Sequence, residues 1–144
     1  MRSVFLAWPF WAVLSAIFAA FTAIFAKVGV AQINPDFATL IRTVVILAVL
    51  AGIVTATGQF QPPAAIPART WIFLVLSGLA TGASWICYFR ALKLGDAARV
   101  APIDKLSVVM VAIFGVVFLG EHLSASMWFG VGLIAVGALL VAGI

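Results

Sequence analysis

Four charged residues stand inside long apolar segments of the sequence: Arg42, Arg90, Asp104 and Lys105. A charged side chain near the centre of a bilayer costs about 2.5–3.5 kcal/mol on insertion scales, so it is expected to face water or an opposite charge. At 1.5 Å per helical residue, Arg42, Asp104 and Lys105 lie within about 12 Å of the starts of their segments, and Arg90 lies near the end of its segment. These segment ends all belong to the same, predicted cytoplasmic, side of the membrane. Three cations beside one carboxylate predict a basic mouth that attracts an anionic or zwitterionic solute, with Asp104 paired to Arg42 or Arg90.

A purely structural role is the alternative for these cations. Long Arg and Lys side chains near a helix end extend to the lipid headgroups. This fits Arg90 best, because it is closest to the end of its segment, whereas Arg42 and Lys105 are deeper and both roles stay open for them. The short side chain of Asp104 cannot reach the surface in this way, so an ion pair is expected for it.

Two helix faces combine aromatic rings with hydroxyl groups, which suits the wall of a site for an amphipathic solute. The rings would bury apolar surface while the hydroxyls fix orientation. Helical spacing places on one face Trp11, Ser15, Phe18, Thr22 and Phe25, and on a second, smaller face Thr81, Trp85 and Tyr88. Packing between helices explains the same spacing, and we favour packing for the first face.

The elements that must position these residues follow from the composition. Of the 144 residues, 66% are hydrophobic and 8% charged, against roughly 25% charged residues in an ordinary soluble domain. Stretches of about 20 apolar residues are long enough to cross about 30 Å of hydrocarbon. We expect a single all-α integral membrane domain over 1–144, with five transmembrane helices at about 4–26, 35–57, 70–94, 97–119 and 124–144. The first segment is too long for the apolar core of a secretory signal.

Local signals mark where the helices begin. The triplet 34–36, Asn-Pro-Asp, reads as an N-cap, a first helical residue and a first-turn acid. Asp96 and Ser124 are expected to cap the last two helices. Residues 58–69 contain three prolines and are expected to form a non-helical connection.

Other signals mark where helices end or bend. Lys27 and Gly29 are expected to end the first helix, through a cation at the helix dipole and a residue that can turn. Gly95 and Gly120 are expected to end the third and fourth. Pro102 lacks an N–H and its ring clashes with the preceding turn, so it is expected to bend the fourth helix.

The distribution of Lys and Arg predicts the orientation in the membrane. Five spans put the two termini on opposite sides. Arg2 and Arg69 lie on the N-terminal side, and on the other side lie Lys27, Arg90, Lys93 and Arg99. The positive-inside rule therefore places the N-terminus outside and the C-terminus in the cytoplasm. The net charge of +4 is attributed to this loop bias and not to nucleic-acid binding.

A family resemblance appears toward the second half of the chain. Its residues are the runs 88–92, 95–97, 100–103 and 118–121, together with Gly130, Gly132 and Gly137. The sequence resembles one EamA-type domain of the drug/metabolite transporter (DMT) superfamily over nearly its whole length. Most members of that superfamily have ten helices, in two halves of opposite orientation around a substrate path. The chain is similar to one half, and its orientation resembles that of the second.

The resemblance implies a permease or exporter of small organic metabolites in a bacterial-type cytoplasmic membrane, working by alternating access as a homodimer or with a paralogous partner. Inverted halves would require two copies inserted in opposite directions, whereas the Lys/Arg bias favours one direction. Parallel copies, dual insertion and a second protein all stay open.

Two other functions compete with that of a transporter. A non-transporting membrane subunit that associates through glycine-rich helices uses the same small residues, such as the pair Gly78 and Gly82. A proton-coupled small-multidrug-type efflux pump would need an acid in the first helix, and 4–26 contains none.

Enzymatic chemistry has little support in the sequence. No nucleophile with a nearby base, metal-ligand motif or phosphate-binding glycine loop is found, so no enzyme, metal or cofactor is expected. The single cysteine, Cys87, cannot form an intramolecular disulfide. Glu121 and His122 lie together in the turn after the fourth helix. Proton coupling is the alternative role for this pair, and we assign Glu121 a structural role beside the last helix.

Overall fold

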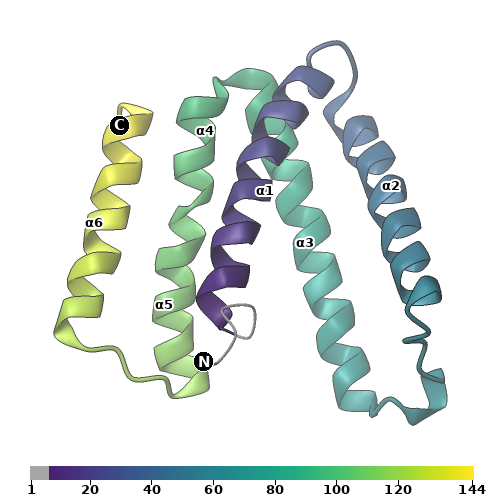
Figure 1. The fold of residues 1–144 in the computed structure, drawn as a ribbon. Coiled ribbons are helices and arrows are strands. Elements are labelled where there is room, and N and C mark those ends of the chain that lie inside the picture. Colours follow the sequence, from purple (N-terminus) through teal and green to yellow (C-terminus); the bar gives the residue numbers. More distant parts are fainter. Residues whose placement is uncertain (1–6) are drawn as a thin grey trace. The chain divides into compact units, whose positions relative to one another are not determined.

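The computed structural model describes residues 7–144, and these residues form helices joined by short connections (Figure 1). Five segments are long and apolar enough to cross a membrane, and the described residues contain no strand. The chain is therefore a multi-pass, all-α membrane protein. The elements are α1 (Trp8–Val30), α2 (Pro35–Ala56), the short 3₁₀ helix η2 (Pro63–Ala65), α3 (Ala68–Leu94), α4 (Ala97–Asp104), α5 (Leu106–Leu119) and α6 (Ala125–Ala142).

Two predicted helix starts are confirmed by their hydrogen bonds. The Asn34 side chain accepts from the backbone N–H of Asp36 at 2.8 Å and of Phe37 at 3.3 Å, which caps α2. The Ser124 hydroxyl accepts from the N–H of Met127 at 3.4 Å at the start of α6. Asp96 occupies the cap position of α4, but its side chain makes no capping hydrogen bond.

The prediction that Lys27 and Gly29 end the first helix is wrong, because α1 continues to Val30. Glycine inside a helix costs only about 1 kcal/mol relative to alanine, so Gly29 does not stop it. The carbonyl of Val30 accepts a hydrogen bond from Lys93 Nζ at 2.9 Å, and this bond satisfies the end of the longer helix. Ala7 lies outside the helix, and the predicted helical residues 4–6 lie outside the described part of the chain.

The predicted helix 97–119 is divided into α4 and α5 at Lys105, three residues after Pro102. The missing N–H of proline and the clash of its ring disturb the helical ladder here. The backbone N–H of Lys105 is shared between the carbonyls of Ala101 at 3.2 Å and Pro102 at 3.1 Å, as in a tightened turn. Together α4 and α5 provide one membrane span, Ala97–Leu119. The predicted break at Gly120 is confirmed by its left-handed φ of 68°.

The chain divides into two compact units. The first contains the described residues up to Val28 together with Leu94–Ile144, and the second contains Gly29–Lys93. In the first unit α6 runs alongside α4 and α5 (Figure 1), with Gly115, Ala138 and Ala142 buried.

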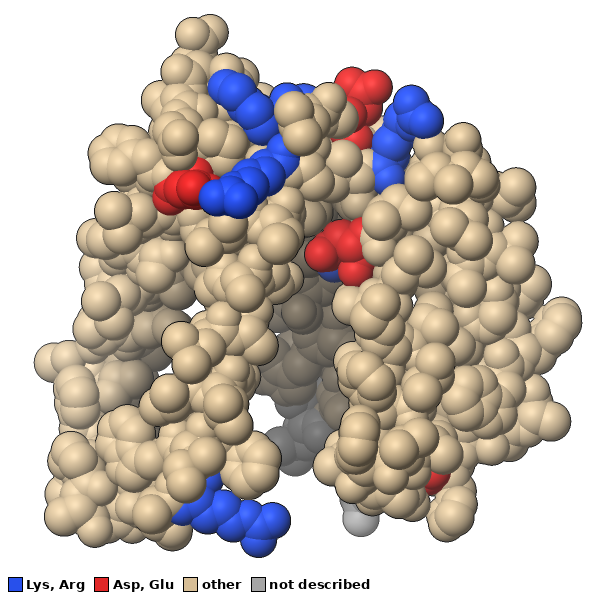
Figure 2. Space-filling view, turned by 180° about the vertical axis from the view of Figure 1, so that it is seen from behind, with Lys and Arg blue, Asp and Glu red and all other residues tan. Residues whose placement is uncertain are grey.

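The second unit has its small core where α2 begins and α3 ends. The buried residues there are Val30, Ala38, Thr39, Phe89 and Leu92. Most of the helical surface stays outside these cores, since between 6% and 11% of each membrane-spanning window is buried within the chain. Charged side chains occupy only a small part of the face shown in Figure 2. Such a surface requires the lipid bilayer as its surroundings.

Candidate functional site

The side chain of Arg42 lies over two aromatic rings of α3. Its Cζ is 4.2 Å from the ring centroid of Trp85 and 5.5 Å from that of Phe89. Arg42 and Trp85 are half-buried, and Phe89 is buried. Cation–π contacts of this kind contribute about 0.5–2 kcal/mol and hold a guanidinium without neutralising its charge.

Arg90 pairs with the carboxylate of Asp36, which the sequence predicts only as an acid in the first turn of a helix. Its Nε donates to Asp36 Oδ1 at 3.0 Å and its Nη2 to Asp36 Oδ2 at 2.7 Å. The two side chains are 60% and 48% exposed, respectively. This two-bond pair joins the first turn of α2 to the end of α3, so Arg90 is not the partner of Asp104.

The partner of Asp104 is its neighbour in the chain. Lys105 Nζ donates to Asp104 Oδ2 at 3.0 Å, where α4 ends and α5 begins. This pair belongs to the first unit, whereas Arg42 and Arg90 belong to the second. The expected long-range partner of Asp104 is thus replaced by a local one.

Three further cations cap the C-terminal ends of helices. Lys27 Nζ donates to the carbonyl of Gly95 at 2.7 Å, directly after α3. Lys93 Nζ donates to the carbonyls of Val30 at 2.9 Å and Ala31 at 2.6 Å, where α1 ends. Arg99 donates to the carbonyl of the last residue of α6, Ala142. The last carbonyls of a helix lack partners within it and carry its negative dipole end, so these cations have a structural function.

The predicted aromatic and hydroxyl face of α1 is largely exposed in the chain. Trp11 is 58% exposed, Phe18 61% and Phe25 69%. Ser15 is exposed and Thr22 is half-buried. The Trp11 ring meets that of Phe10 edge to face at 5.4 Å. In the membrane such a face meets lipid, a solute or another protein surface.

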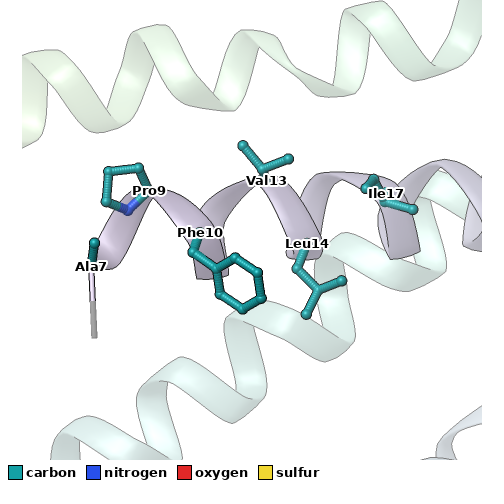
Figure 3. Close-up of a pocket in the computed structure, with 6 residues that line it drawn as sticks. All are labelled: Ala7, Pro9, Phe10, Val13, Leu14 and Ile17. Carbon is teal, nitrogen blue, oxygen red and sulfur yellow. The ribbon is translucent and has the colours of Figure 1, made fainter. Parts of the chain in front are cut away.

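A hollow of about 390 Å³ lies along the first half of α1, beside this face (Figure 3). Its lining consists of Ala7, Pro9, Phe10, Val13, Leu14 and Ile17. None of the predicted face residues lines it, and no lining side chain has a polar group that could orient a solute. The hollow fits hydrocarbon chains and is not counted as part of the site.

On the second face, the structure brings Trp85 to Arg42 but engages Thr81 elsewhere. The Thr81 hydroxyl donates to the carbonyl of Ser77 at 2.8 Å, one turn back in α3. Tyr88 is half-buried on the same helix. Within residues 7–144, no group of three or more His, Cys, Asp or Glu side chains is placed to hold a metal ion.

Comparison with known proteins adds to this geometry. Residues 6–143 match the EamA-like transporter family. The chain belongs to this family. A protein of Sinorhizobium sp., named as an uncharacterized transporter in the cobO 3′ region, is 76% identical over 135 residues. The alignment covers 94% of the chain and 96% of that relative. No solved structure matches the chain.

Membership in the EamA-like transporter family, together with five membrane-spanning segments, points to a membrane transporter. The match to the family extends over all five of these segments. The chemistry offered by the described residues is that of recognition: a guanidinium on aromatic rings, a guanidinium–carboxylate pair and a Lys–Asp pair, all within helices that cross the membrane.

Two residues of this EamA-like transporter were missed as site residues in the sequence. Phe89 is four residues after Trp85, and this helical spacing is the signal that could have placed it beside Trp85. The structure shows that its ring also lies under Arg42. Asp36 was interpreted only as a first-turn acid. Its pairing with Arg90 spans 54 residues, and no local signal in the sequence announces it.

Proposed function

We propose that the chain is a permease or exporter of small organic metabolites that works by alternating access. The observation that carries this proposal is the presence of charged side chains inside the membrane-spanning helices of an EamA-like transporter. Such residues are rare in membrane helices and mark solute or ion pathways. Within the second unit Arg42 and the pair of Arg90 with Asp36 are the candidates, and within the first unit Asp104 and Lys105.

The working form in this proposal is a dimer, of two copies or of the chain with a paralogous partner. Support comes from the small buried share of each span, 6–11% of the window. The remaining surface is available to lipid and to a second five-helix domain. Transporters of many folds place the substrate path between two repeats near the middle of the membrane.

The proposed setting is a bacterial-type cytoplasmic membrane, with the N-terminus outside and the C-terminus in the cytoplasm. The Lys/Arg distribution supports this orientation. The three helix caps formed by Lys27, Lys93 and Arg99 lie at the ends of the first, third and fifth spans, which alternate crossing puts on one side of the membrane. These cations therefore stabilise helix ends on that side of the membrane, in addition to contributing to the Lys/Arg bias that sets the orientation.

A ligand screen followed by transport tests the proposal. Purified protein is heated in the presence of amino acids, carboxylates, nucleosides and cationic dyes, because a ligand that binds the folded state raises its apparent stability. Radiolabelled hits are then assayed for uptake by proteoliposomes. We expect saturable uptake with wild-type protein and reduced uptake with Asp104→Asn and with Arg42→Gln, each inserted normally. Arg69→Gln, on the other side of the membrane, serves as the control.

Two results would contradict the proposal. Unchanged uptake in both variants removes the charged residues from the path. Binding of a hit without any uptake by wild-type proteoliposomes favours a membrane subunit that does not transport.

A further inference from the structure

Arg42 is a charge inside a membrane span to which the described residues provide no counterion. The structure records its contacts with the rings of Trp85 and Phe89. Within residues 7–144 the ion pairs join Arg90 to Asp36 and Lys105 to Asp104, and neither includes Arg42. No hydrogen bond from its guanidinium to a described residue is recorded either.

Arg90 in the same unit provides the contrast. Its guanidinium is held by both carboxylate oxygens of Asp36, so its charge is balanced and its Nε and Nη2 donors are used. The rings beside Arg42 hold the guanidinium in place but leave its charge unbalanced. A guanidinium has five N–H donors in a planar fork, and this fork matches two oxygens of a carboxylate.

The depth of Arg42 argues against a role in reaching the lipid headgroups. Counted along α2, Arg42 lies about 9 Å deeper than Asp36, at 1.5 Å per residue. Arg90 pairs with Asp36 and so marks the same level on α3. Counted from Arg90 along α3, Trp85 is about 7.5 Å deeper in the membrane and Phe89 about 1.5 Å deeper. The guanidinium is nearer to the ring of Trp85 than to that of Phe89. It therefore stays near its own level in the helix and does not extend toward the start of α2, where the nearer membrane surface lies.

We propose that Arg42, held over Trp85 and Phe89, binds the carboxylate of a small organic acid that has an apolar or aromatic body. The guanidinium donates to the two carboxylate oxygens, and the half-buried ring of Trp85 provides apolar surface for the rest of the molecule. This inference rests on the proposed function, because it names the substrate class of that transporter. Exposed aliphatic side chains on both sides of Arg42, Ile41 at 47% and Val45 at 56%, make its surroundings apolar.

Benzoate is the probe, and benzamide, which has the same shape without the charge, is the matched control ligand. Binding is measured by calorimetry on the full chain in nanodiscs of neutral phosphatidylcholine. We expect benzoate to bind, and benzamide to bind at least about tenfold more weakly, since charge-assisted hydrogen bonds are lost. Arg42→Gln weakens benzoate binding by at least about tenfold on the same grounds, while Arg69→Gln leaves it unchanged.

A second variant protects the test against misfolding. Arg42→Lys keeps the charge but loses the planar fork, so it is expected to bind benzoate more weakly than wild type and more tightly than Arg42→Gln. Circular dichroism and gel filtration show whether Arg42→Gln folds. If it does not fold, Arg42→Lys becomes the test, and benzoate binding by this variant as tight as that of wild type overturns the assignment of the guanidinium as the carboxylate-binding group. Equal benzoate binding by wild type and Arg42→Gln, or none by wild type, overturns the inference as well.

Lipid phosphate is the competing source of an anion, and two further measurements separate it from an organic acid. Nanodiscs that contain phosphatidylglycerol abolish benzoate binding if Arg42 holds a headgroup, and inorganic phosphate then displaces benzoate. Either result overturns the assignment to a carboxylate. Failure here is distinguishable from failure of the transporter itself: proteoliposomes with Arg42→Gln that still take up a hit at the wild-type rate retain transport without this site.

Discussion

Arg99 joins the beginning of α4 to the last residue of α6. Its Nε and Nη2 donate to the carbonyl of Ala142 at 2.9 Å and 2.6 Å. The next residue, Gly143, has a left-handed φ of 76°, and a Cβ built there would stand 3.1 Å from Arg99 Nη2. The helix end, the glycine and the arginine therefore form one arrangement, in which a cation stabilises the carbonyl end of a membrane helix.

Loss of this cap is expected to destabilise the chain. Arg99→Gln should lower the free energy of unfolding by about 1–2 kcal/mol, because hydrogen bonds from a charged donor to a helix end are lost. Arg69→Gln is the matched control, since the structure records for Arg69 a single ring contact, at 5.9 Å from Phe73. Thermal unfolding in detergent, followed by circular dichroism, measures both. Equal stability of the two variants would show that the bonds to Ala142 contribute nothing.

A double-mutant cycle is expected to reveal contact between Gly115 and Glu121. A Cβ built on Gly115 would stand 2.5 Å from Glu121 Oε2, whereas a Cβ on Gly52 meets nothing within 4 Å. Gly52→Ala should therefore raise the free energy of unfolding by up to about 1 kcal/mol, because alanine favours the helix more than glycine does. Gly115→Ala should raise it by less, because the Glu121 carboxylate must move. In a Glu121→Ala background Gly115→Ala should regain the difference. The same effect of Gly115→Ala in both backgrounds would mean that the two residues do not interact.

The sequence predicts features that depend on local chemistry. The cap at Asn34, the left-handed turn at Gly120 and the five apolar segments all follow from neighbouring residues, and each is confirmed. The end of α1 depends on Lys93, which is 63 residues away from Val30, and local signals at Lys27 and Gly29 therefore misplaced it.

The same distinction explains the candidate site. The types and depth of the charged residues could be read from the sequence, because a charge in an apolar run is visible there. The partners of Arg90 and Arg42 could not be read from it, because these contacts join α2 to α3, and the register of the two helices is set by tertiary packing. Phe89 is intermediate: its spacing from Trp85 was visible, but only the position of Arg42 gives it a role.

The aromatic and hydroxyl face of α1 is expected either to contact the solute or to pack against other helices, and a substitution at Phe18 distinguishes these two roles. Phe18 is 61% exposed within the chain and Ile24 is 57% exposed on the same helix, outside the predicted face. Phe18→Ala should change the relative uptake of different solutes more than it changes the yield of folded protein, because a wall residue contacts the solute. Ile24→Ala should leave both unchanged. Loss of folded Phe18→Ala protein would show that this ring serves packing.

The orientation of the chain can be decided by labelling single cysteines in intact cells. In a Cys87→Ser background, Gln32→Cys lies between α1 and α2, and Gln61→Cys lies between α2 and α3; both positions are exposed. The Lys/Arg bias predicts that an impermeant maleimide labels Gln61→Cys in intact cells and Gln32→Cys only after permeabilisation. Complete labelling of Gln61→Cys before permeabilisation would show that all copies have one orientation. The transporter would then be completed by a parallel copy or by a second protein. Half-labelling of both variants in intact cells would contradict the single orientation and instead indicate two copies inserted in opposite directions.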